Sequence, residues 1–145
     1  MDNTISWISL AFSLLAGGFS LFTYISGVRH DRKEATLNAF NTLQNEVFDK
    51  LNLLQPAEIA EIAKHNRSEE YKTVSGYIAR IEHFAVGVKM KIYDRETVYK
   101  LAHGYLDGKQ ITSRIEPIIG RKQANADEDY FENIHWLLDW MRKHK

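Results

Sequence analysis

An uncharged segment at the start of the chain limits what it can fold into. From Asn3 to Val28, 26 consecutive residues carry no charge, whereas all 19 Lys and Arg residues lie from Arg29 onward. A helix needs about 20 mainly apolar residues to cross a hydrocarbon core of roughly 30 Å. Because the uncharged run is longer than this minimum, the sequence predicts a single membrane span over residues 1–28.

Two other structures compete with a span for this segment. A cleaved signal peptide needs a basic region at its start, but this chain begins with Met1 and Asp2. A buried helix of a globular domain is the other alternative, because Ser and Thr residues interrupt the apolar run. The length of the run favours the span, with Trp7 and Tyr24 as interfacial aromatic residues near its two ends.

The charges on the two sides of the segment predict its orientation. Arg29, Arg32 and Lys33 follow it directly, whereas Asp2 is the only charged side chain before it. Basic residues next to a span are retained on the cytoplasmic side. We therefore expect a single-pass protein of the inner membrane, with its N-terminus outside, its C-terminal domain in the cytoplasm and these three basic residues on lipid headgroups.

Small residues recur within the segment at a helical spacing. Ser9, Ser13 and Gly17 lie four residues apart, and Ser20 extends the same side of a helix. Small side chains allow two helices to approach closely in lipid. We therefore expect a homo-oligomer that associates through this face. A pore lined by hydroxyl groups is an alternative, although no charged residue within the segment supports it.

The residues after Val28 are predicted to form an all-α domain. Pro occurs only at positions 56 and 117, and apolar residues recur at a 3–4 spacing instead of alternating. No Pro separates the first segment from Leu54, so one helix is expected to continue from the span into the domain. The predicted fold is an N-terminal transmembrane helix, residues 1–28, continuing into an antiparallel bundle of about four helices, residues 29–145.

Local signals mark the predicted helices. Pro56 suits a first helical turn, and Ser68, Asp94 and Asp127 can each cap the helix that follows. Pro117 permits a kink or a restart. One apolar stripe early in the domain suits either the bundle core or a seam between copies, and consists of Leu37, Phe40, Val47, Leu51 and Leu54.

No pattern of residues indicates catalysis, so we expect no enzyme activity, no metal and no cofactor. The absence of Cys excludes disulfides, thiolate zinc sites and a cysteine nucleophile. Glu132 and His135 have the E-x-x-H spacing of di-metal bundles, but such a site uses two copies of the motif and only one is present. Arg95 and His103 are too far apart for the Arg–His motif of helical RNases, which leaves a cryptic helical-bundle nuclease as a third-ranked hypothesis.

The charge balance bears on possible partners. Lys and Arg number 19, as do Asp and Glu, whereas a nucleic-acid binder usually carries a basic excess. Nucleic acid is therefore not an expected partner. Arg and Trp are enriched at protein interfaces, so Arg121, Trp136 and Trp140 are candidates for contact with a protein partner; burial of the two Trp side chains in the core is the alternative.

Several strings in the C-terminal half resemble one protein family. They are YIARIEHFAVGVKMKIYD at 77–94, IEPIIGRK at 115–122 and YFENIHWLLDWM at 130–141. The chain resembles a bacterial family known only as a domain of unknown function, number 4760. The resemblance implies a short protein with an N-terminal span and a helical domain, and it supplies no catalytic residue. The layout is also similar to that of pore-forming membrane effectors of CRISPR-associated antiviral systems.

These observations together suggest a function. We expect a non-enzymatic, membrane-anchored oligomeric effector in antiphage defence. Its helical domain would assemble copies or sense a partner, and its spans would perturb the inner membrane or form a pore. The alternative is a membrane-tethered module that binds and recruits a cytosolic partner.

Overall fold

The computed structural model describes residues 2–107, 109–124 and 131–144, with the backbone alone for residues 2–11, 107, 109–110 and 122–124. All elements in these ranges are helical, which confirms the predicted all-α class. Two short π-helical turns, η1 and η2, accompany the α-helices. The elements are α1 (Asp2–Leu43), η1 (Gln44–Phe48), α2 (Asp49–Leu53), α3 (Pro56–Lys64), α4 (Glu69–Lys89), α5 (Arg95–Ala102), η2 (His103–Asp107), α6 (Lys109–Ala124) and α7 (Glu132–Lys143).

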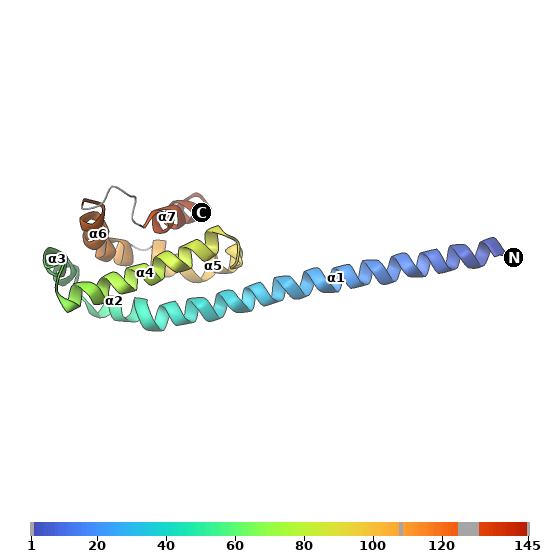
Figure 1. The fold of residues 1–145 in the computed structure, drawn as a ribbon, viewed down its shortest axis with the longest axis horizontal. Coiled ribbons are helices and arrows are strands. Elements are labelled where there is room, and N and C mark those ends of the chain that lie inside the picture. The colour runs from blue at the N-terminus through green and yellow to red at the C-terminus, as the bar shows by residue number, and fades with distance from the viewer. Residues whose placement is uncertain (1, 108, 125–130, 145) are drawn as a thin grey trace.

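The predicted continuous helix is confirmed. α1 runs from Asp2 to Leu43 without a break, and Leu43 and Asp49 on either side of η1 both keep helical backbone angles. Figure 1 shows α1 as a rod that extends far beyond the other helices, with the N-terminus at its distant end. The remaining helices gather around the C-terminal part of this rod and form a helical domain.

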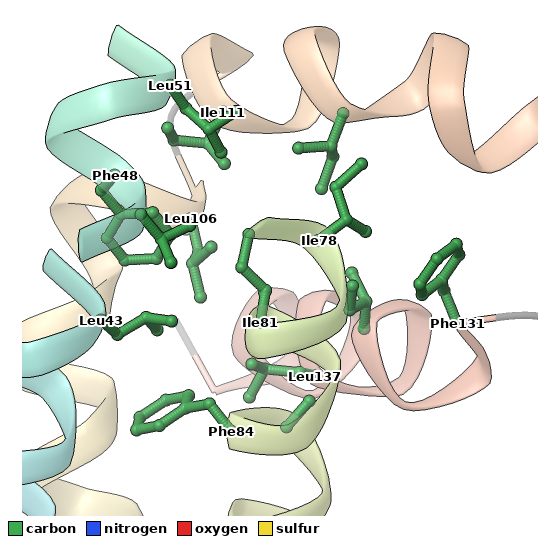
Figure 2. Packing of buried hydrophobic residues seen from close by; sticks show 14 of the residues in the cluster. Leu43, Phe48, Leu51, Ile78, Ile81, Phe84, Leu106, Ile111, Phe131 and Leu137 are labelled. Atoms are coloured by element: carbon green, nitrogen blue, oxygen red, sulfur yellow. The ribbon is translucent and has the colours of Figure 1, made fainter. Parts of the chain in front are cut away.

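The core of the helical domain lies between the rod and the later helices. Figure 2 shows side chains from α1, η1 and α2 facing those of α4, α6 and α7. Phe40, Val47 and Leu51 of the predicted apolar stripe are buried, whereas Leu37 is 43% exposed. The stripe therefore forms bundle core in the single chain. Leu37 does not belong to this core, because it lies on the outer side of α1.

The predicted helix starts agree with the structure where it describes them. The Ser68 hydroxyl accepts a hydrogen bond of 3.1 Å from the Tyr71 amide, and Asp94 accepts one of 3.0 Å from the Thr97 amide. Pro56 opens α3. Pro117 lies inside α6 and does not end it. The predicted cap at Asp127 lies outside the described residues.

α7 is capped from a distant helix. Phe131, which precedes it, has a left-handed φ of 70° and gives no side-chain cap. Glu82 of α4 accepts hydrogen bonds from the amides of Asn133 (3.2 Å) and Ile134 (2.9 Å), and from the Asn133 side chain (2.6 Å). A carboxylate at this place satisfies the unpaired amides of the first turn and suits the positive end of the helix dipole.

The predicted location needs correction. Among the helices of the described part of the chain, we find none that is both long and apolar enough for a membrane span. Ser, Gly and Thr residues interrupt the apolar residues of α1, and charged residues occur in it at Asp2 and from Arg29 onward. The expectation of a single-pass inner-membrane protein, with its N-terminus outside and its C-terminal domain in the cytoplasm, is therefore wrong. The predicted contact of Arg29, Arg32 and Lys33 with lipid headgroups depends on that location, so its basis is removed as well.

Replacing Glu82 tests how α7 is held. We expect Glu82→Ala to lower the free energy of unfolding by about 1–3 kcal/mol, because the amides of the first turn lose their acceptor. Urea unfolding followed by circular dichroism measures this change. Glu116→Ala, which removes an exposed carboxylate on α6, is the control. Equal stability of the two variants would contradict the capping role.

Candidate functional site

The most unusual surface is the part of α1 outside the helical domain. We call residues 12–28 the arm. Eight large apolar side chains of the arm are 56–73% exposed: Phe12, Leu14, Leu15, Phe19, Leu21, Phe22, Tyr24 and Ile25. The largest apolar patch of a typical monomer covers about 300–600 Å² and often marks a contact site. The arm is therefore the first candidate for a functional surface.

The predicted small residues lie on one open side of the arm. An added Cβ at Gly17 would meet no atom within 4 Å, and Ser13 and Ser20 are exposed. Further along, a shallow groove of about 540 Å³ has Ser20, Thr23 and Gly27 among its lining residues, beside the rings of Phe19 and Tyr24. The side chains of Trp7 and Ser9 lie outside the described residues. The small side is thus accessible to another helix.

The base of the arm is fixed to α5 by a buried hydroxyl. Thr36 is completely buried; its hydroxyl donates to the carbonyl of Arg32 (2.6 Å) and accepts from the amide of Asp94 (2.8 Å). The guanidinium of Arg29 lies 3.9 Å from Glu96. Two of the three predicted headgroup residues thus make contacts within the chain. Arg29 does so through its side chain and Arg32 through its backbone carbonyl.

The same junction perturbs the titration of Asp94. Partial burial acts to raise its pKa, but the hydroxyl and amide of Thr97 donate to this carboxylate, and Lys33 and Arg29 lie near it. These groups together hold the pKa of Asp94 below its ordinary value of 3.8. Asp94 is therefore charged at neutral pH, and its charge favours the folded junction.

A second candidate site is a groove beside η1. It has a volume of about 470 Å³ and lies between α1, η1 and α4. The buried side chains of Leu43, Val47 and Phe84 underlie the groove, and an ion pair between Glu46 and Arg80 lies at it. The other lining residues are Asn38, Ala39, Thr42, His83 and Tyr93. Apolar walls with a few charged groups are typical of ligand and peptide sites.

Sequence reasoning missed this groove for a physical reason. Glu46 and Arg80 are 34 residues apart, and no local motif links them. A π-helical turn, which often occurs at functional sites, contributes Glu46 and Val47, but it has no clear sequence signal. Tyr93 closes one side, because its ring packs against Gly87, where an added Cβ would come within 2.3 Å of it.

The predicted aromatic contact residues form a packed cluster. Trp136 and Trp140 are half-buried and stacked, with ring centroids 6.2 Å apart and planes 12° apart. The guanidinium of Arg95 lies 5.4 Å from the Trp136 ring centroid and donates to the carbonyls of Val88 and Lys89 at the end of α4. The two Trp residues thus pack α7 against α5, and Arg95 connects this cluster to the end of α4. Arg121 lies on α6, also half-buried.

Glu132, one of the two residues with metal-site spacing, pairs with a lysine. The ammonium of Lys89 bonds to Glu132 at 2.9 Å and to the Asn133 side chain at 3.0 Å. This hydrogen bond and the charge of Lys89 hold the pKa of Glu132 below its ordinary value. In the part of the chain that the structure describes, no three His, Asp or Glu side chains come together as metal ligands.

Comparisons with known proteins identify the family. The family model described as "Domain of unknown function (DUF4760)" matches residues 8–140, so the chain belongs to this family. This confirms the resemblance inferred from the sequence strings. No curated protein and no solved structure matches the chain. The likeness to pore-forming antiviral effectors has no support from these comparisons.

Acid titration tests the junction at the base of the arm. Because the folded state lowers the pKa of Asp94, its contribution to stability is present above pH 3.8 and is lost as the pH falls through the lowered value. We expect Asp94→Asn to be less stable than the wild type at pH 7, with the difference shrinking below about pH 4. Thermal unfolding across this pH range measures the difference. Asp139→Asn on α7 is the control, and a difference that persists unchanged at pH 2 would contradict the prediction.

Proposed function

We propose that this member of the DUF4760 family is a non-enzymatic assembly protein, in which the arm joins copies of the chain and each copy contributes a helical domain. The exposure of the large apolar side chains along the arm is the observation that carries the proposal. Exposed apolar surface of this extent is stabilised when a partner excludes water from it.

The area of the arm is sufficient for an interface. Its four aromatic side chains alone expose roughly 500 Å², given that such a side chain presents about 150–250 Å² in total. Four large aliphatic side chains add to this area. One partner of a standard interface contributes about 800 Å², so the arm has the size needed for a stable contact.

A second copy of the chain is the occupant that the charges favour. The arm contains no Asp, Glu, Lys or Arg, so two arms bring no charged side chains into a desolvated contact. The chain's own helical domain cannot cover the arm, because α1 is a continuous rod and the domain lies toward its other end (Figure 1). The cover must therefore come from another molecule.

Binding of a partner by the helical domain is a second candidate function. The observation that favours it is the groove beside η1, where the Glu46–Arg80 ion pair lies beside apolar surface. This function is independent of assembly, because the groove is distant from the arm along α1.

Charge substitutions in the arm test the proposed assembly. We expect the wild-type chain to form oligomers and Phe19→Lys/Phe22→Lys to be monomeric with unchanged helical content, because the charges oppose burial of the arm. Light scattering coupled to gel filtration measures the mass. Leu53→Lys, at an apolar residue that is 80% exposed on α2, should assemble like the wild type.

Three results would contradict the proposal. One is a wild-type chain that remains monomeric at all concentrations measured, and another is assembly that survives the double substitution. The third is binding of a monomeric wild-type chain to phosphatidylcholine vesicles, lost in the double variant, which would assign the arm to lipid instead.

A further inference from the structure

We infer that two arms pair in opposite directions, so that the helical domains of the two copies lie at the two ends of a shared rod. The inference rests on the proposed function and adds the geometry of the contact. The observation behind it is a repeat of residues along α1. Other helices of the same chain cover one half of this repeat, and the other half is exposed.

The repeat has the spacing of a coiled-coil seam. Residues separated alternately by three and four positions run from the arm into the domain, as in a heptad. In the arm these are Phe12, Leu15, Phe19 and Phe22, which are 69–73% exposed. The same spacing continues through Ser26, Arg29 and Lys33. The next residues of the repeat are Thr36, Phe40 and Leu43, which are at most 5% exposed.

Other helices of the same chain cover the buried half of the repeat. The amide of Asp94, at the start of α5, bonds to Thr36. The ring of Phe40 lies 6.2 Å from that of Phe84 in α4 and 5.7 Å from that of Tyr105 in η2. The arm thus continues a helix surface that, within the domain, packs against other helices. In the arm the same surface is exposed.

This arrangement excludes a long parallel pair. A parallel partner that follows the repeat beyond Arg29 would need the space occupied by α5 and α4, because Thr36 and Phe40 are already covered. In an antiparallel pair, the part of the partner's α1 that the structure describes, from residue 2, can pair along its length without that space. If Phe12 faces Phe22 and Leu15 faces Phe19 of the other copy, residue 2 falls opposite residue 32.

Charge complementarity supports the same direction. In this register position 2, an Asp, falls opposite a stretch of the other copy in which the basic residues Arg29, Arg32 and Lys33 outnumber the acidic residues Asp31 and Glu34. Arg32 is exposed and the Arg29 side chain is 67% exposed, so both are accessible to a carboxylate. The shared segment of about 30 residues separates the two domains by roughly 45 Å along the rod.

Cross-linking tests the direction, because the natural chain has no Cys. We expect an equimolar mixture of full-length Phe12→Cys and Phe22→Cys chains to form a disulfide-linked dimer under mild oxidation. Each variant alone should remain largely unlinked, since its two Cys residues would lie about 15 Å apart along the axis, beyond disulfide range. A mass tag on one variant identifies the mixed dimer on a non-reducing gel.

A second measurement leaves the arm unchanged. Met90 is 68% exposed at the end of α4, so Met90→Cys chains can carry a donor or an acceptor dye. Partial energy transfer, corresponding to a dye separation of roughly 45 Å, is expected when the two domains lie at opposite ends of the shared rod, whereas adjacent domains would give nearly complete transfer.

The outcomes separate this inference from the proposed function. Strong linking of each single variant with itself, or nearly complete energy transfer between domains, would overturn the antiparallel direction while assembly through the arm stands. A wild-type chain that is monomeric by light scattering, with no linking in the mixture, would overturn the proposed function as well.

Discussion

The burial of one side of α1 by α4 and α5 is the constraint on which the rest of the structure depends. Thr36 and Phe40 lie on that side, and their contacts with Asp94, Phe84 and Tyr105 fix the rod to the domain. Because α1 has no break, the covered part also determines the direction in which the uncovered arm extends. The arm is therefore held in a defined orientation by contacts made elsewhere.

Side-chain hydrogen bonds to backbone groups complete the domain around this rod. Glu82 caps α7 from α4, and Arg95 bonds to the carbonyls at the end of α4 while its guanidinium lies over Trp136. Glu82 satisfies amides of the first turn of α7, and Arg95 adds a side-chain donor to carbonyls of the last turn of α4. Trp136 contacts Arg95 and stacks on Trp140, and both Trp residues are half-buried, so the arm is the more accessible surface.

Features with a local cause could be predicted from the sequence. The caps at Ser68 and Asp94 depend on hydrogen bonds within one turn, and the stripe of Phe40, Val47 and Leu51 depends on the helical period. The groove at Glu46 and Arg80 could not be predicted, because it needs two segments to meet. The predicted span was wrong, because among the described helices none is both long and apolar enough to cross a membrane.

The sequence by itself determined the all-α class, the unbroken rod and the uncharged character of its first part, since these follow from helical periodicity, Pro placement and the position of charges. Only the tertiary structure decided which half of the repeat along α1 is covered. It also decided that Glu82, and not a neighbouring residue, accepts the first amides of α7. The physical reason is that packing joins residues distant in the chain, and local preferences do not contain that information.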